Sequence, residues 1–524
     1  MSRFRPALAA LALSLAVPLS LAAPLPALAE VSADQVWTLM QDQVAGAGGT
    51  LRATATRQGN RLVLSHPEML LANGTILQLP DLTLSETPDR AVNLELPPQF
   101  PLVVDTPPGT DSPDTLTFTV SAPDLAVQIR GLGDQADFSI SAGSLSAALD
   151  RFDMPPGAPR PDDVFLALAL ADLSLIWAHD AVSADKWVDA SGSLGTLHAE
   201  MRIDAAAENL DASLALDLSA LSAALSIFAP ADTEQQFGAG AGEPDIPAAL
   251  ALLDQGLRLS FQATSGPAAL VFDAPKSPDG PASLHVTAGS GAADVRFDRT
   301  GIVYDTSTTG LTLAFLGQVP DMPIDRFGFS LGEYRTNYRL GFPGTPDLAG
   351  ADPAWGVLFR LTGMDLSPEL WALLDPGQVL PQDPMSLVLD FAGTYRLDPR
   401  ALEPGFTIEP GAPPPLTAAT LTLTQAMVEG LGLSFTGAGG LDLDFTDLVT
   451  YDGAPRPSGK LSFVTTGANA LLDRLERLGL LASDEMTGAR LGLLFIGRMA
   501  GDDRLETDLE FRDTGFYLNG QKIR

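Results

Sequence analysis

The chain contains no cysteine among its 524 residues. This absence excludes disulfides, thiolate metal sites, a cysteine nucleophile and the acylated cysteine of a lipoprotein. Secreted eukaryotic chains of this size normally carry disulfides, so the absence fits a bacterial envelope protein better. The stability of the fold must therefore come from packing.

Basic residues are scarce, since 31 lysines and arginines stand against 65 acidic residues and give a formal net charge of −34. Such a chain repels phosphate backbones and anionic membrane surfaces at long range, so we expect no nucleic-acid partner. The acidic side chains are expected to keep a β-rich surface in solution and to discourage edge pairing. Because 45% of the residues are hydrophobic, the chain is nevertheless expected to fold.

A long apolar run occurs at the N-terminus. Arg3 and Arg5 precede it, and a small-residue segment from Ala27 to Ala29 ends it before Glu30. This order is typical of a cleavable secretory signal. Prolines interrupt the run, which leaves it too short for a membrane-spanning helix of about 20 residues. We expect cleavage after Ala29, a periplasmic location and no transmembrane segment in the mature chain.

Most of the remaining sequence alternates apolar and polar residues between Gly, Pro and Asp punctuation, which predicts strands with one buried and one wetted face. The clearest cases are 62–64, 116–120, 125–129, 164–170, 214–218, 284–286, 311–315, 387–391, 421–423 and 441–445. In the last of these, Leu441 and Leu443 share one face while Asp442 and Asp444 share the other. The pattern predicts a mainly β protein with an elongated, repeat-like antiparallel sheet, either curved around a groove or packed as a sandwich.

Short amphipathic segments interrupt the predicted strands and resemble one another. We predict helices at 144–152, 219–228, 367–374 and 469–479, with a further helix at 35–44 and a returning strand at 491–496. The segment 367–374 has the strongest boundaries, with a Ser cap, a Pro in its first turn and an Asp-Pro-Gly stop.

Two Pro/Gly-rich segments, 231–247 and 403–415, are the best boundary candidates. They divide the chain into a signal peptide over 1–29, an N-terminal β-rich unit over 30–230 and a C-terminal β-rich unit over 246–524. The segment 403–415 is a candidate sub-boundary within the second unit.

One motif suggests nucleophilic catalysis. Gly328, Ser330 and Gly332 match the nucleophile elbow of serine hydrolases, whose histidine follows the serine in the chain. All four histidines (His66, His179, His198 and His285) precede Ser330, so we regard a hydrolase as the least favoured function.

Other candidate chemistry is weaker. Ser183 and Lys186 match a serine–lysine pattern but lack its companion motifs. The acidic groups Asp442, Asp444 and Asp447, and Asp502, Asp503, Glu506 and Asp508, contain oxygen ligands suited to calcium but no calcium-loop spacing. We therefore assign no catalytic residue, no cofactor-binding residue and no metal site, and we predict a protein that is not an enzyme.

The segment from Met364 through Trp371 to Gly377, followed by Leu380–Pro384 and a strand over 386–393, resembles an alphaproteobacterial envelope family, domain-of-unknown-function family 2125. The signal followed by Trp37, and the ending 511–520, fit the same resemblance. It implies a periplasmic protein and lends no catalytic residues. The last segment is also similar in style to AsmA-like envelope proteins, which are associated with outer-membrane lipid homeostasis.

These observations favour a periplasmic protein that binds a lipid or another apolar ligand on a β-sheet face or groove, since an uncovered apolar face usually marks a binding site. A sandwich, in which two sheets cover each other, would leave no such groove. The alternative is a scaffolding protein that binds other envelope proteins by strand addition at an open edge.

Overall fold

The fold is mainly β with a few short helices, as the alternation predicts. The structure is a computed structural model that describes residues 31–524 except 108–112, 133–134, 156–159, 182, 184, 232, 234–245, 319–322, 345–350, 404–405, 407–412 and 513–514. The predicted signal at 1–29 lies outside the described residues, as do most residues of the two predicted boundary segments. By internal contacts the chain divides into two units, described separately below.

Unit 1 comprises the described residues up to Phe228 together with Ala263–Leu284. Its elements are α2 (Ala33–Gly46), β1 (Thr50–Gln58), β2 (Arg61–Leu70), β3 (Ile76–Gln78), β4 (Leu82–Glu86), β5 (Val92–Glu95), β6 (Gln99–Asp105), β7 (Thr115–Ser121), β8 (Ala126–Leu132), β9 (Gln135–Asp153), β10 (Asp163–Asp180), β11 (Lys186–Ala205), a 3₁₀ turn η1 (Ala206–Glu208), β12 (Leu210–Ala229) and β14 (Ala268–Lys276). Strands β13 (Arg258–Ser265) and β15 (Ala282–Ala288) each contribute residues to both units.

Unit 2 contains the remaining described residues. Its elements are α4 (Ile246–Asp254), β16 (Ser290–Asp298), β17 (Gly301–Leu316), β18 (Arg326–Gly341), β19 (Ala354–Leu366), α5 (Pro368–Leu374), β20 (Met385–Leu397), η3 (Pro399–Leu402), β21 (Leu416–Gly430), β22 (Leu433–Asp444), β23 (Arg456–Thr466), α6 (Ala468–Arg477), α7 (Ser483–Ile496), β24 (Arg498–Gly501), β25 (Arg504–Arg512), β26 (Gly515–Leu518) and β27 (Gln521–Lys522). From β16 to β23 each strand pairs antiparallel with the next one in the chain.

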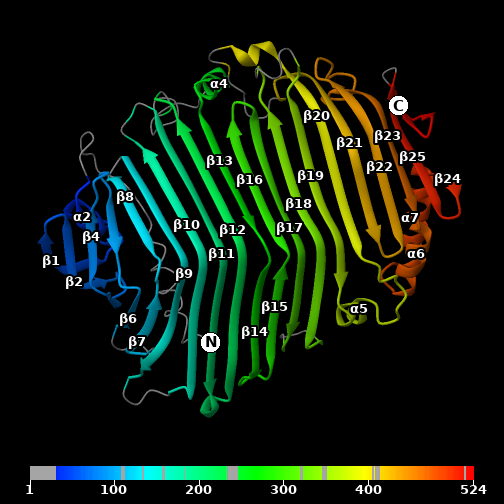
Figure 1. Cartoon of the computed structure of the whole chain (residues 1–524). Coiled ribbons are helices and arrows are strands. Elements are labelled where there is room, and N and C mark those ends of the chain that lie inside the picture. The colour runs from blue at the N-terminus through cyan, green and yellow to red at the C-terminus, as the bar shows by residue number, and fades with distance from the viewer. Residues whose placement is uncertain are drawn as a thin grey trace. The chain divides into compact units, whose positions relative to one another are not determined.

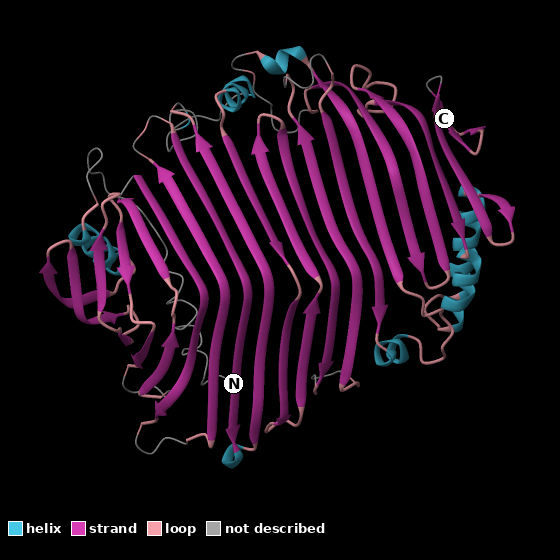
Figure 2. Cartoon of the chain, viewed as in Figure 1, coloured by secondary structure: helices cyan, strands magenta, loops and turns pink. Residues whose placement is uncertain are grey.

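Three of the predicted helices are confirmed, those at 35–44, 367–374 and 469–479, which correspond to α2, α5 and α6 (Figure 2). The caps explain two of them. The Ser32 hydroxyl accepts a hydrogen bond from the backbone of Gln35 in a capping box, and the Ser367 hydroxyl accepts one from Leu370.

Two predicted helices are wrong. Residues 144–152 belong to β9 and residues 219–228 belong to β12. In the first segment Leu145, Leu149 and Phe152 have helical spacing, but Leu145, Ala147 and Leu149 also alternate as a strand requires. Antiparallel pairing with β10 on one side and β7 on the other decides between the two periods.

The predicted strand at 491–496 is also wrong, because these residues form the last turns of α7. The run Leu-Gly-Leu-Leu-Phe-Ile has no regular period, and a short apolar run cannot be assigned to a strand or a helix by periodicity alone.

The best-buried core of unit 1 lies under α2, whose Val36 and Trp37 pack with Leu64, Leu84 and Val92 of the first short strands. A second, smaller core contains Leu77, Val104 and Phe118 from β3, β6 and β7. Buried side chains are therefore concentrated near the N-terminal end of unit 1.

The long strands of each unit bend near mid-length (Figure 1). Within β10 the backbone of Asp172 is left-handed at φ 54°, and within β17 that of Gly310 is left-handed at φ 59°, and neither residue has a cross-strand partner in the register. Side chains otherwise alternate between faces, so each such residue shifts the alternation by one position. Leu170 and Leu173 consequently lie on the same face, and Gly195 opposite the bend leaves room for the Asp172 side chain, which a Cβ there would meet at 2.8 Å.

Candidate functional site

One face of strands β9 to β12 and β14 in unit 1 is predominantly apolar. Cross-strand pairing places Leu145 of β9, Leu170 of β10 and Leu197 of β11 in one row, and the next row on this face, Ala147, Leu168 and Ala199, is apolar as well. The face, hereafter the unit 1 apolar face, includes Ile140, Leu145, Leu149, Val164, Leu166, Leu168, Leu170, Leu173, Leu175, Trp177, Leu197, Met201, Ile203, Leu214, Leu216, Leu270 and Phe272.

The opposite face of the same strands is polar. His198 of β11 bonds through its Nδ1 to Asp217 of β12 at 2.6 Å, and its Nε2 lies 3.8 Å from Glu200. The hydrogen bond with Asp217 raises the pKa of His198 above its ordinary value, and the nearby Glu200 carboxylate acts in the same direction. The guanidinium of Arg202 lies over the ring of Phe165 on this face. The sheet therefore has a wetted side and an apolar side, as the alternation predicts.

The unit 1 apolar face is only partly covered. At one end Leu149 and Leu166 pack against the Leu77, Val104 and Phe118 core, although β9 separates β7 from β10 in the sheet. That contact requires the sheet to curve here. Beyond Asp172, Leu175 remains 39% exposed, whereas Ala142 and His179 on the same face are buried. The cover of the apolar face is therefore uneven.

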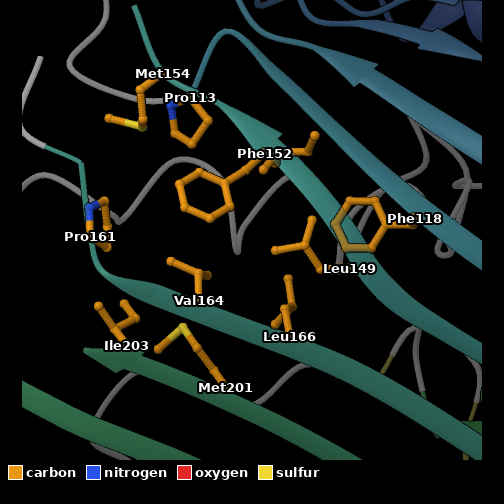
Figure 3. A pocket seen from close by; sticks show the side chains of 11 residues that line it. Pro113, Phe118, Leu149, Phe152, Met154, Pro161, Val164, Leu166, Met201 and Ile203 are labelled. Atoms are coloured by element: carbon orange, nitrogen blue, oxygen red, sulfur yellow. The ribbon is translucent and has the colours of Figure 1, made fainter. Parts of the chain in front are cut away.

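A hollow lies where this cover ends (Figure 3). Strand β7 contributes Leu116 and Phe118, and the neighbouring loops contribute three further side chains. All eleven lining residues are apolar: Pro113, Leu116, Phe118, Leu149, Phe152, Met154, Pro161, Val164, Leu166, Met201 and Ile203. The side chains of β9, β10 and β11 point toward one another across the hollow in the close-up.

The size of the hollow suits part of an apolar molecule. It measures about 600 Å³ with the part open to solvent included. An ordered water in such a space needs polar partners that these side chains do not offer. Phe118, at 1% exposed, is the most buried of the lining side chains.

An arginine marks the border of the hollow. The Arg160 guanidinium carbon lies 5.0 Å from the centre of the Phe152 ring, while the Phe152 side chain lines the hollow. A cation over an aromatic face is a favourable arrangement that also keeps the charge near water. The border is therefore polar while the interior is apolar.

Unit 2 also has one apolar face. Tyr304 of β17 lies opposite Tyr338 of β18, which lies opposite Val357 of β19 and, beyond it, Phe391 of β20. The two tyrosine rings are 6.0 Å apart and both side chains are more than 40% exposed. The other face carries the Arg335–Asp305 ion pair, and hydrogen bonding to Arg335 lowers the pKa of Asp305.

Ser330 lies within β18, with Thr312 and Asp365 as its cross-strand partners. A nucleophile elbow requires a sharp turn from a strand into a helix, and this serine has none. The four histidines likewise belong to strands, namely β2, β10, β11 and β15. His179 lies on the unit 1 apolar face, where its Nδ1 accepts a hydrogen bond from Trp177 at 3.2 Å.

Ser183 and Lys186 lie at the turn between β10 and β11. The Ser183 hydroxyl donates to Asp180 at 2.7 Å, and its backbone nitrogen donates to the same carboxylate. Lys186 begins β11. The serine therefore serves the turn between two strands.

The two acidic groups have structural partners. Asp444 and Asp447 both contact Arg456, and hydrogen bonds from Thr446 and Thr450, respectively, lower the pKa values of these carboxyls. Within the described part of the chain, no three His, Asp or Glu side chains are arranged to hold a metal ion.

In the second group, Glu506 pairs with Arg498 and Arg504, and Asp508 pairs with Lys460. The carboxylate of Asp503 accepts hydrogen bonds from the backbone nitrogens of Asn469 and Ala470 at the start of α6.

The hollow is not evident from the sequence. Its residues come from four strands and the adjoining loops, between positions 113 and 203, and only the pairing of β7 with β9 and of β10 with β11 brings them together. The alternation of apolar and polar residues in each strand predicts the apolar face, but it does not predict which strands lie next to one another.

No family model, curated protein or solved structure matches the chain. Among the described helices, none has the length and apolar character needed to cross a membrane.

Proposed function

We propose that this protein is a non-enzymatic periplasmic envelope protein that binds a lipid, or another apolar ligand, through hydrocarbon contacts in the hollow and along the unit 1 apolar face. The observation that carries the proposal is the hollow itself, whose eleven lining residues are all apolar. The periplasmic part of the proposal rests on the N-terminal signal pattern and on the resemblance to domain-of-unknown-function family 2125.

The chemistry of the hollow favours an alkyl chain over a headgroup. A chain of methylene groups gains roughly 0.8 kcal/mol for each group that leaves water. A polar headgroup would lose its hydration without finding partners among the lining side chains. With a net charge of −34, the protein also repels anionic groups at long range. We infer that the alkyl chain enters the hollow and that the headgroup stays at its border.

The first test is purification of the protein under native conditions, without detergent, followed by organic extraction and mass spectrometry. We expect a lipid or other apolar compound to co-purify in a fixed ratio, and its removal to lower the thermal stability of the protein. A protein that carries no such compound, and whose stability is unchanged by delipidation, would refute the proposal.

The second test places a polar side chain in the hollow. Leu166→Asn puts an amide on the hollow side of β10, whereas Ala169→Asn puts the same amide on the exposed opposite side of the same strand. Binding of a long-chain fluorescent fatty acid should weaken by about tenfold for Leu166→Asn, since burying an unpaired amide costs about 1–3 kcal/mol. It should stay unchanged for Ala169→Asn, and equal affinities for the two variants would contradict the assignment of the hollow.

The location is tested separately. N-terminal sequencing of the protein recovered from the periplasm should begin at Glu30. A chain that retains Met1 and remains in the cytoplasm would exclude the periplasmic part of the proposal.

A further inference from the structure

The last two turns of α7 in unit 2 present an apolar surface to solvent. Leu491, Leu494, Phe495 and Ile496, together with Met499 just beyond the helix, are each at least half exposed, and Phe495 is 73% exposed. We call these five residues the α7 patch. Large apolar side chains exposed together usually mark an interaction surface.

The helix is fixed in place by its other side. Arg490 pairs with Asp473 of α6, and the side chains of Met486 and Leu493 are partly buried at the matching helical positions. At the C-terminal end the Asn519 side chain donates a hydrogen bond to the carbonyl of Ile496 at 2.8 Å. The α7 patch is thus held outward by a helix anchored at two points.

The sequence makes this exposure unavoidable. Four consecutive apolar residues, 493–496, extend around more than one face of an α-helix, so a helix that packs on one side must expose some of them. Leu491, Leu494 and Phe495 follow the spacing that places side chains on one helix face. Gly488 and Gly492 have no heavy atom within 4 Å of an added Cβ, so the outward surface beside the patch is also open.

The charge of the segment around the α7 patch is balanced. Residues 468–500 contain four arginines and four acidic residues, whereas the whole chain has 31 basic and 65 acidic residues. The α7 patch itself contains no ionisable side chain, and the neighbouring Arg498 is paired with Glu506. Charges next to the α7 patch therefore add no net repulsion from a lipid surface to that of the whole acidic chain.

The extent of the α7 patch argues against a second copy of the chain as its partner. A stable protein interface uses about 20–30 residues on each side, and the patch offers five. A helix that lies in a lipid interface needs only its own apolar side, which enters the boundary between headgroups and acyl chains.

We propose that the α7 patch docks this protein on a lipid surface without net charge, with Phe495 and its neighbours among the upper acyl chains. The patch shares no residue with the hollow of unit 1, so the proposal does not depend on ligand binding there.

The absence of cysteine allows a direct test. A single cysteine introduced as Gly492→Cys can carry an environment-sensitive fluorophore beside the α7 patch, and Gly46→Cys at the end of α2 provides a matched control with equally open surroundings. On addition of phosphatidylcholine vesicles we expect a blue shift and increased intensity at position 492 and no change at position 46. Binding that leaves position 492 unchanged would overturn the proposal.

Substitutions within the α7 patch provide a second test. Leu494→Asp and Phe495→Asp should each lower vesicle partitioning, measured by flotation, by about tenfold, because each places a charge in the lipid interface. Leu374→Asp on α5 is the control, since Leu374 and Leu494 are equally exposed at 56%. Partitioning of the parent protein should also fall as anionic lipid replaces phosphatidylcholine at low salt.

Three further results would overturn the proposal. The first is no binding of the parent protein to phosphatidylcholine vesicles, and the second is an equal loss in all three aspartate variants. The third is a concentration-dependent dimer, seen by light scattering, that Phe495→Asp abolishes while vesicle binding is absent, which would assign the α7 patch to self-association.

Discussion

The carboxylate of Asp503 accepts hydrogen bonds from both the backbone nitrogen and the side-chain amide of Asn469, each at 2.9 Å, across 34 residues of chain. Its second oxygen accepts the backbone nitrogen of Ala470 at the same distance. The N-cap position of α6 is Gly467, which has no side chain to fill this role. The turn between β24 and β25 therefore caps α6 and links this helix to the C-terminal strands.

Removing this cap should destabilise unit 2. Asp503→Gly deletes the carboxylate but tolerates the left-handed backbone found there, with φ of 46°. We expect a loss of about 1 kcal/mol in the free energy of unfolding, which urea denaturation followed by circular dichroism would measure. Asp502→Gly, at the neighbouring exposed position, is the control. Equal effects of the two substitutions would show that Asp503 does not stabilise α6.

A second prediction concerns the close approach of strands at Gly393 in β20. A Cβ at this position would overlap the carbonyl oxygen of Thr420 and lie 2.7 Å from Nε1 of Trp355, which itself donates to that carbonyl. Gly393→Ala must displace the strand or break the hydrogen bond, and should cost about 2 kcal/mol or more.

The matched control is Gly488→Ala in α7, where an added methyl group meets no atom within 4 Å. This substitution should raise stability by about 0.5–1 kcal/mol, since alanine favours a helix over glycine. Thermal unfolding of the two variants should therefore shift in opposite directions. A neutral Gly393→Ala variant would contradict the close strand packing.

A third prediction concerns pH. The folded-state pKa of His198 is raised, chiefly by its hydrogen bond with Asp217, so the protonated histidine stabilises the folded state. This contribution is fully present below the unfolded-state pKa of about 6.5 and is lost as the pH rises through the folded-state pKa. Because the side chain is 46% exposed, solvent screening limits the effect to less than about 1 kcal/mol.

Comparison of the parent protein with His198→Gln would measure this effect. The difference in unfolding free energy should be largest in mildly acidic solution and should shrink as the pH rises above 6.5. NMR titration of the imidazole should give a pKa above that of an unstructured histidine. A difference that grows with pH would reverse the sign of the interaction.

The fold class could be predicted because the strand pattern is local. In β12 the residues Leu214, Leu216 and Leu218 alternate with Ala215 and Asp217, and the pairing with β14 confirms that the leucines share a face with Leu270 and Phe272. Local patterns also predicted α5 and α6, because their apolar spacing and their boundaries fit a helix and not a strand.

Prediction failed where one sequence satisfies two periods. In residues 219–228 the Ala-, Ser- and Leu-rich composition favours a helix, and only the neighbouring strands hold the segment extended. The bend at Ala220, with φ of 48°, was also invisible in the sequence because alanine rarely adopts this conformation. The hollow could not be predicted for a related reason. Leu116 and Met201 line the same hollow only because the strand pairings of the whole unit bring them together.

The uninterrupted succession of pairings from β16 to β23 has a consequence for how unit 2 assembles. Every pairing in this series joins strands that are consecutive in the chain, which gives it a low contact order and a small entropic cost for each closing loop. Each hairpin can form once its second strand is available, without waiting for residues near the C-terminus. The growing edge of the sheet then serves as the template for the strand that follows, so this part of the protein can assemble in the direction in which it is synthesised.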